Sequence, residues 1–401
     1  MNNIPIEIIR IIVKYNKSLK ISMTSLNKLL YSYRKFLSIN MNYLAKDHYI
    51  TDFQIDTLYN VSDSSFLIND KKIKKIIFDE YFNEELDNFQ QNITHLTFGD
   101  DFNQNVDNLP ENITHLTFGY KFDQKVNNLP KNIIHLIFGC DFNQNVDDLP
   151  KNITHLTFED RFNQKVNNLP ENVTCLIFKR AFNQNVDNLP KNITHLTFGF
   201  RFNQQVNNLP ENILHLTFGY NFNQNVDNLP ENILNLIFGY HFNQNVDKLP
   251  ENITHLTFGE KFNKKINNLS QSITHLIFGE CFNQKIEIFP QSITHLFFRK
   301  HFNQLVYNLP QNITYLTFGE DFNQKIDNLP DSITHLTFGE AFNQNINNYP
   351  KNIIELTFGM KFNKKINKLP EMLTLLTINC KYEFLKIKYP NIKYIFLEEV
   401  D

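Results

Sequence analysis

The chain has 401 residues and a formal net charge of −3, and its Lys and Arg residues are scattered, which argues against the basic stripe of a nucleic-acid-binding surface. No stretch reaches the ~18 consecutive apolar residues of a membrane span, and residues 1–7 lack the basic start and apolar run of a signal peptide. The four cysteines form no C-x-x-C pair, which favours free thiols in a reducing compartment and predicts a cytoplasmic protein without a disulfide or metal framework.

Residues 1–45 have an amphipathic pattern that predicts a small module of short helices. Pro5 suits the first turn of a helix, and Ser25 is suited to cap the start of another. The opening I-P-x-E-I resembles an F-box, whose first helix begins with L-P-x-E-I/L, with Ile4 in place of the usual Leu. This resemblance implies an apolar face that docks on a Skp-type linker of a cullin–RING ubiquitin ligase. The face would consist of Ile4, Pro5, Ile8, Ile9, Ile12 and Leu26.

Three further segments follow this module. Residues 46–71 are polar, with interspersed aromatics and no period, which predicts a junction or N-terminal cap. Residues 72–397 form a repeat array with degenerate coils at both ends. Residues 398–401 are an acidic tail, whose charge would protect the open edge of the last strand from pairing with another chain.

The array repeats every 20 residues without any change of spacing. Two Phe columns, from Phe78 to Phe358 and from Phe82 to Phe362, hold 30 of the 39 Phe residues. Fourteen of the 15 prolines and all 11 glycines each occupy one column. A short fixed period is typical of a solenoid, in which each repeat is one coil stacked on its neighbours.

Each coil is predicted to contain one short strand. In the segment from Thr114 to Phe118, the period of two points Leu116 and Phe118 inward and leaves His115 outward. Pro110 removes a backbone donor, so the L-P side of the coil cannot join a regular ladder. The Asn columns that contain Asn103 and Asn112 are expected to run as hydrogen-bond ladders. The fold class is therefore mostly β, a single leucine-rich-repeat-like solenoid with one parallel sheet behind a small helical module.

The block L-P-x-N-I-T-H-L-T-F-G-x-x-F-N-Q resembles the FNIP repeat, named for its F-N-x-x-I/V-x-x-x-P run. The resemblance covers about residues 72–397 and rests on columns that recur more than a dozen times. FNIP arrays are characteristic of social amoebae and of giant viruses that infect amoebae. It implies a repeat scaffold, and for a viral protein it implies the cytoplasm of the host.

Ten of the 13 histidines occupy one outward column. Such a stripe could bind metal or sense pH, since closely spaced imidazoles resist protonation. The alternative is a surface residue copied with the repeat, because no carboxylates alternate with the histidines. Cys175 lies in this column between His155 and His195, but a flat sheet offers no pocket or oxyanion donors, so we expect no enzyme.

The variable positions after the Gly column offer the main candidates for partner choice. Phe200, Tyr220 and Tyr240 recur in three consecutive coils, with Arg201 beside them, and an acidic run from Glu260 to Glu340 follows. Aromatic and Arg residues on a rigid surface are typical of an interaction hot spot. The alternative is neutral drift at solvent-exposed positions.

Together these patterns predict a monomeric adaptor without cofactor or metal. The F-box-like module would recruit a Skp-type linker while the solenoid binds an unknown target protein for ubiquitination. The alternative is a non-enzymatic scaffold in which the N-terminal helices only cap the solenoid. Neither alternative involves a nucleic acid or a membrane.

Overall fold

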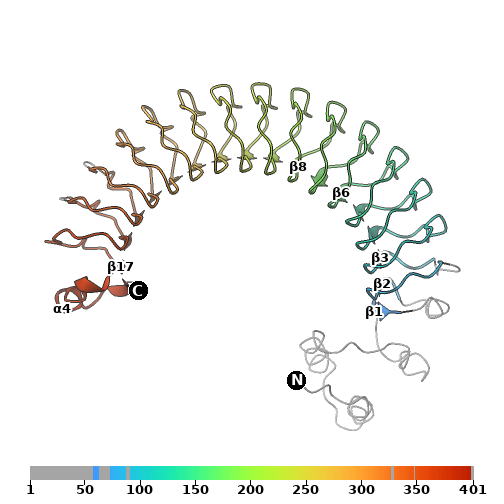
Figure 1. Cartoon of the computed structure of the whole chain (residues 1–401), viewed down its shortest axis with the longest axis horizontal. Coiled ribbons are helices and arrows are strands. Elements are labelled where there is room, and N and C mark those ends of the chain that lie inside the picture. Colours follow the sequence, from blue (N-terminus) through green and yellow to red (C-terminus); the bar gives the residue numbers. More distant parts are fainter. Residues whose placement is uncertain (1–56, 63–72, 87–90, 327–328, 347, 399–401) are drawn as a thin grey trace, which may run out of the picture.

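The computed structural model describes residues 57–62, 73–86, 91–326, 329–346 and 348–398. In this part of the chain, eighteen strands form one sheet that lines the inner side of a long arc, and turns occupy the outer side (Figure 1). The helical module expected over residues 1–45, with its docking residues Ile4, Pro5, Ile8, Ile9, Ile12 and Leu26, lies outside the described residues.

The strands are short and separated by a nearly constant number of residues. In chain order they are β1 Thr57–Val61, β2 Lys75–Phe78, β3 His95–Thr97, β4 His115–Thr117, β5 His135–Ile137, β6 His155–Phe158, β7 Cys175–Phe178, β8 His195–Thr197, β9 His215–Thr217, β10 Asn235–Ile237, β11 His255–Thr257, β12 His275–Ile277, β13 His295–Phe297, β14 Tyr315–Thr317, β15 His335–Thr337, β16 Glu355–Thr357, β17 Leu375–Asn379 and β18 Lys393–Leu397. A 3-10 helix, η3 Cys380–Tyr382, and a helix, α4 Leu385–Lys388, lie between the last two strands.

Each strand pairs in parallel with the strand of the next coil, and equivalent residues face each other. Between β4 and β5, His115 pairs with His135 and Leu116 pairs with Leu136. Leu116 and Phe118 are buried, whereas His115 is partly exposed on the concave face, so the predicted inward and outward positions are confirmed.

The two Phe columns fill the space between the sheet and the outer turns. Phe118 and Phe122 are 3% and 0% exposed, and their ring centroids lie 3.7 Å apart. Each ring also stacks on the next coil, with centroids 5.8 Å apart for Phe118 and Phe138 and 6.0 Å apart for Phe122 and Phe142. Because every coil buries its rings against both neighbours, the core is one continuous column rather than a set of separate cores.

The predicted Asn ladders are present, and the second of them runs from Asn92 to Asn252. Oδ1 of Asn203 accepts hydrogen bonds from the backbone N–H of Asn223 at 2.9 Å and from Nε2 of Gln224 at 3.1 Å. In the second ladder, Nδ2 of Asn232 donates to the carbonyl of Glu211 at 2.9 Å. These amides satisfy turn backbone groups that the short strands leave unpaired, which keeps the irregular side of the coil in register.

The Gly column marks the closest approach of neighbouring backbones. A Cβ atom on Gly219 would lie 1.8 Å from the carbonyl oxygen of Gly199. No described glycine has a positive φ, so close approach rather than a left-handed conformation favours glycine here. Where Glu159 and Lys179 replace glycine, strands β6 and β7 run one residue longer, and the N–H of Lys179 bonds the carbonyl of Phe158 at 2.9 Å.

Both described ends of the sheet depart from the regular coil. Strand β1 pairs with β2, so the sheet begins inside the segment expected to be a junction. At the other end, η3 and α4 fold over the last coil, with Tyr382 and Leu385 only 6% and 1% exposed. Strand β18 then pairs with β17, and the hydroxyl of Tyr394 donates to the carbonyl of Leu385 at 3.2 Å.

Candidate functional site

The aromatic stack, defined as Phe200, Tyr220 and Tyr240, lies at the rim of the concave face. Each residue follows the carboxyl end of its strand, and parallel strands bring these ends to one edge of the sheet. The loop backbones form their own ladder there, since the N–H groups of Asn221 and His241 donate to the carbonyls of Phe200 and Tyr220, both at 2.9 Å. Side chains 20 residues apart are therefore held directly above one another.

The three rings form a parallel stack. Ring centroids lie 4.5 Å apart between Phe200 and Tyr220 and 4.6 Å apart between Tyr220 and Tyr240, with interplanar angles of 8°. Phe200 is 43% and Tyr220 38% exposed. The predicted alignment of these residues along one edge is therefore observed, whereas their role in binding a partner stays a prediction. A rigid exposed aromatic surface loses little side-chain entropy when it is covered.

Cationic side chains cover both ends of the aromatic stack. The Arg180 guanidinium lies 5.9 Å from the centroid of Phe200, and the Lys261 ammonium lies 5.5 Å from the centroid of Tyr240. His241 contacts Tyr220 edge-on, with centroids 4.9 Å apart. Negative charge on Cys281 and then on Tyr240 raises the pKa of Lys261, whose ammonium group is charged at neutral pH.

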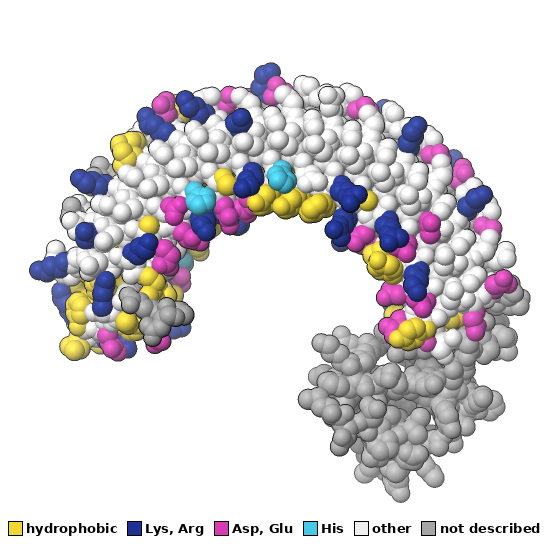
Figure 2. All heavy atoms as spheres, viewed as in Figure 1, with side chains coloured by type: hydrophobic (Ala, Val, Ile, Leu, Met, Phe, Trp, Pro, Cys, Tyr) yellow, Lys and Arg dark blue, Asp and Glu magenta, His cyan; other side chains and the backbone are white. Residues whose placement is uncertain are grey.

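The charged residues of the rim are distributed unevenly around the stack. Figure 2 shows hydrophobic side chains along the middle of the inner rim, with basic side chains interspersed with acidic ones toward one arm of the arc and a mixed cluster rich in acids toward the other. Glu260 begins the acidic run and lies 3.5 Å from Arg299, while Lys300 pairs with Glu320 at 3.4 Å. Arg201 is exposed, and no described carboxylate lies within ion-pair distance of it.

The histidine column forms stacked imidazole ladders on the concave face. Ring centroids lie 4.1 Å apart for His95 and His115, 4.4 Å for His115 and His135, and 4.2 Å for His135 and His155. Cys175 interrupts the ladder, which resumes with other histidines farther along the arc. Parallel rings cannot aim their nitrogens at one shared point, so this arrangement does not favour chelation of a metal.

Threonine hydroxyls contact the histidine rings of the ladder. Oγ1 of Thr114 lies 3.1 Å from the carbonyl oxygen of Thr94 and 2.9 Å from Nδ1 of His115. Burial and then neighbouring imidazoles lower the pKa of five members of the column. These are His115, His135, His195, His275 and His295.

Cys175 lacks the activated thiol of a catalytic nucleophile. Burial raises the pKa of the Cys175 thiol, which reduces its thiolate fraction, the opposite of what a nucleophile needs. Cys140, Cys175, Cys281 and Cys380 are free thiols. Among the described residues, no group of three or more His, Cys, Asp or Glu side chains could hold a metal ion. Within the same ranges, no helix is long and apolar enough to cross a membrane.

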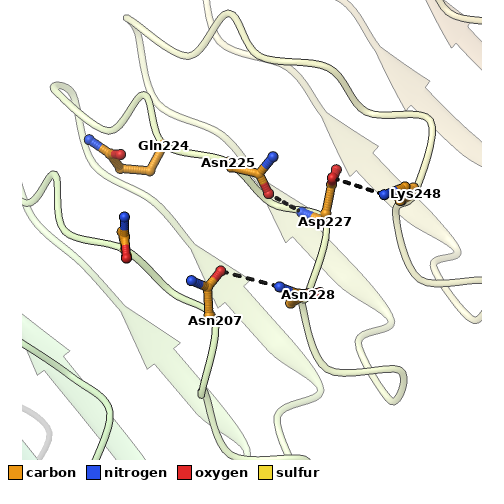
Figure 3. A pocket seen from close by; sticks show the side chains of 7 residues that line it. Asn207, Gln224, Asn225, Asp227, Asn228 and Lys248 are labelled. Carbon is orange, nitrogen blue, oxygen red and sulfur yellow. Dashed lines mark hydrogen bonds and ion pairs between the residues drawn. The ribbon is translucent and has the colours of Figure 1, made fainter.

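A shallow pocket of about 390 Å³ lies among the polar turns (Figure 3). Its walls are mostly amide side chains, and several of them are already bonded to each other. Nδ2 of Asn228 donates to Oδ1 of Asn207 at 3.4 Å, and Lys248 pairs with Asp227 at 3.2 Å. This pocket therefore belongs to the ladder system and contains no charged group aimed into it without a partner.

A second apolar surface, which is not among the sites predicted from the sequence, lies on the outer turns. Ile288, Leu305 and Tyr307 are 72%, 40% and 52% exposed on neighbouring coils. In the array they are the apolar residues of three columns that otherwise hold polar side chains. A column-by-column search for single apolar replacements would have found them.

Comparison with known proteins identifies the repeat. The model of the FNIP Repeat family matches residues 105–141, 142–180, 165–199, 202–241, 222–260, 242–281, 262–301, 302–341 and 322–349. A comparison with curated proteins finds no match.

Two solved structures resemble the chain over most of its length. CroV588, described as a novel circular leucine-rich-repeat protein, is 34% identical with a TM-score of 0.58, over 82% of this chain and 67% of that one. YopM from Yersinia enterocolitica WA-314 is 14% identical with a TM-score of 0.50, over 89% of this chain and 99% of that one, which shows the shared solenoid fold alone. On the evidence of its repeats, its coil geometry and these comparisons, the chain belongs to the FNIP repeat family.

Proposed function

We propose that this protein is an interaction adaptor whose solenoid binds a target protein at the aromatic stack. The observation that carries the proposal is the exposed, preorganised stack of Phe200, Tyr220 and Tyr240. Its rings are held by the loop ladder, so binding pays little entropy to order them. Coils elsewhere in the array differ little from one another, which leaves few other surfaces for choosing a partner.

The finer part of the proposal concerns residues 1–45. The I-P-x-E-I opening supports an F-box-like module that recruits a Skp-type linker of a cullin–RING ubiquitin ligase. In this arrangement the module would connect the ligase to the target held by the solenoid. Ile8 and Ile9 are the residues whose charge substitution should weaken the linker contact most directly.

A pull-down with the full-length protein tests the linker contact. We expect tagged wild-type protein to retain a Skp-type linker and the variant Ile8→Glu/Ile9→Glu to lose it. Ile137→Glu is a matched control, because Ile137 is an exposed isoleucine (38%) on the concave face of the solenoid. If the linker is absent from the wild-type sample, or persists with the double variant, the adaptor role is wrong.

The target contact is tested with the proteins that the tagged wild-type protein retains in the same pull-down. Tyr220→Ala should weaken target binding by about 2 kcal/mol or more, as expected for a hot spot. Tyr120→Ala is the control, since Tyr120 lies in the same column, 48% exposed, between Asp100 and Cys140. Equal loss with both variants would show that the stack is not the contact.

The alternative is a scaffold in which the N-terminal helices serve only to cap the first coil. The Ile8→Glu/Ile9→Glu variant would then unfold at lower urea or aggregate, without any specific loss of a linker. Under the adaptor proposal the same variant keeps the wild-type unfolding midpoint. Circular dichroism during urea unfolding distinguishes these two outcomes.

A further inference from the structure

The aromatic stack presents ring edges rather than ring faces. Its rings lie 4.5 and 4.6 Å apart, which leaves no space for another ring between them. The outer face of Phe200 is covered by Arg180, and that of Tyr240 by Lys261. A partner therefore meets the positively polarised edges of the rings, which favour contact with aromatic faces, aliphatic groups and carboxylates.

Positive charges outnumber negative charges next to the stack. Arg180 and Arg201 are exposed at one end, and Lys261 is exposed at the other. At the positions equivalent to Tyr240 and His241 in these coils, Glu260 is the one carboxylate. Glu260 is already engaged, because it pairs with Arg299 at 3.5 Å and accepts a hydrogen bond from the N–H of Glu280 at 2.9 Å. The surface around the rings thus attracts anionic groups.

We propose that the aromatic stack binds an acidic segment of a partner protein that carries aromatic or aliphatic anchors. The inference rests on the proposed function and names the chemistry of the target contact. From Arg180 to Lys261 the rim spans four coil spacings, about 19 Å at ~4.8 Å per spacing, which matches about six residues of extended chain. Carboxylates would meet Arg180, Arg201 and Lys261, while the anchors contact the exposed edges of Phe200 and Tyr220.

A single-stranded nucleic acid is the competing ligand for a surface with aromatic and basic residues. Such ligands bind by stacking bases on aromatic faces, and here those faces are covered. These covered faces favour a peptide over a single-stranded nucleic acid.

A display selection with the full-length protein tests the proposal. A library of random twelve-residue peptides is depleted on the bare support and then selected on wild-type protein. We expect the enriched peptides to be acidic and to contain Phe, Tyr, Trp, Leu or Ile. The most enriched peptide is then labelled with fluorescein and titrated with protein, with fluorescence anisotropy as the readout.

Matched variants assign the binding to the stack. Tyr220→Ala should reduce affinity about tenfold or more, and Tyr120→Ala should change it less than about twofold. Arg180→Glu/Arg201→Glu should reduce affinity by a similar factor and flatten its dependence on salt, because exposed charge pairs are screened. Circular dichroism of each variant checks that the solenoid remains folded.

Three results would overturn the inference. The first is enrichment of basic or uncharged peptides. If Tyr220→Ala still weakens the binding of these peptides, the aromatic stack remains the proposed target site, but the proposal of an acidic ligand is wrong. The second is tighter binding of a ten-nucleotide uridine oligomer than of the best peptide. The third is no enrichment of any peptide. If neither the peptide nor the captured target protein loses affinity in Tyr220→Ala, the proposed function is wrong as well.

Discussion

Two aromatic residues separated by one glycine have opposite roles in the same coil. Phe218 is 2% exposed and packs on Phe222 with centroids 3.7 Å apart, whereas Tyr220 is 38% exposed on the rim. The chain turns at Gly219, where neighbouring backbones approach closely, so the side chain after the glycine leaves the core. The column in which a residue lies determines its role, since a column is either buried or exposed along the whole array.

The first prediction compares these two residues. Phe218→Ala should lower the free energy of unfolding by about 3–5 kcal/mol, because it removes a buried ring and leaves a cavity. Tyr220→Ala should cost about 1 kcal/mol, since it removes only stacking between partly exposed rings. Urea unfolding followed by circular dichroism measures both, and equal losses would contradict the assigned burial.

The second prediction concerns Asn223, whose Oδ1 accepts the N–H of Asn243 at 2.9 Å and Nε2 of Gln244 at 3.0 Å. Asn223→Ala leaves a backbone donor without its partner and should cost about 1–3 kcal/mol. Asn223→Asp is the matched control, because Asp123 already accepts the N–H of Asn143 at 2.9 Å in the same column. Urea midpoints should fall for the alanine variant and remain near wild type for the aspartate variant.

At the scale of the element, each strand is too short to be stable alone. Strands β3 to β5 have three residues each, and their stability depends on pairing with both neighbours and on side-chain ladders along the arc. The histidine ladder is one of these, and its members are held by threonine hydroxyls at 2.8–2.9 Å. Repetition therefore joins many weak contacts into a continuous ladder that stabilises the short strands.

The third prediction follows from the lowered pKa of His115, His135 and the other shifted members of the column. Between the ordinary value of 6.5 and the lower folded values, the unfolded chain binds more protons than the folded chain. The free energy of unfolding should therefore fall as the pH falls below 6.5. The urea midpoint should be lower at about pH 5.5 than at about pH 7.5.

The matched variant for this pH dependence is His115→Asn/His135→Asn. Asparagine already occupies the same column at Asn235, so the replacement is compatible with the strand. The difference in urea midpoint between the two pH values should be smaller in this variant than in wild type. An unchanged difference would mean that the ladder does not cause the acid sensitivity.

At the scale of the molecule, the arc is a one-dimensional stack in which each coil pairs only with its neighbours. Stability is then approximately a sum of coil and interface contributions, and the register of the whole depends on a constant repeat length. The position of any rim residue is set by counting coils from one end. A ligand site made of several coils is consequently unaffected by distant coils that keep the register.

The fourth prediction tests this modularity. Deletion of residues 122–141 joins Lys121 to Phe142 and removes one complete coil, so the remaining coils keep their columns. This variant should fold, with a slightly smaller dependence of unfolding free energy on urea, because less surface is buried. Deletion of residues 122–131 places core residues in exposed columns and should prevent cooperative folding, as judged by circular dichroism.

Much of the fold was predictable because each column is sampled many times. The apolar period identified Leu116 and Phe118 as inward, and the Asn column identified the ladder that contains Asn203. The strand β1 and the helical turn at η3 could not be predicted in the same way, because they occur once and depend on contacts with the array ends.

The sequence by itself determined the solenoid, its parallel sheet, its buried and exposed columns, and the alignment of Phe200, Tyr220 and Tyr240, since all of these follow from a fixed repeat length. Only the tertiary structure decided that the stack's faces are covered by Arg180 and Lys261. It also decided that the histidine rings stack on one another and that the arc curves around the sheet (Figure 1). The direction in which a side chain points toward the next coil depends on the curvature of the arc and on local packing. The repeat period of the sequence specifies neither of these.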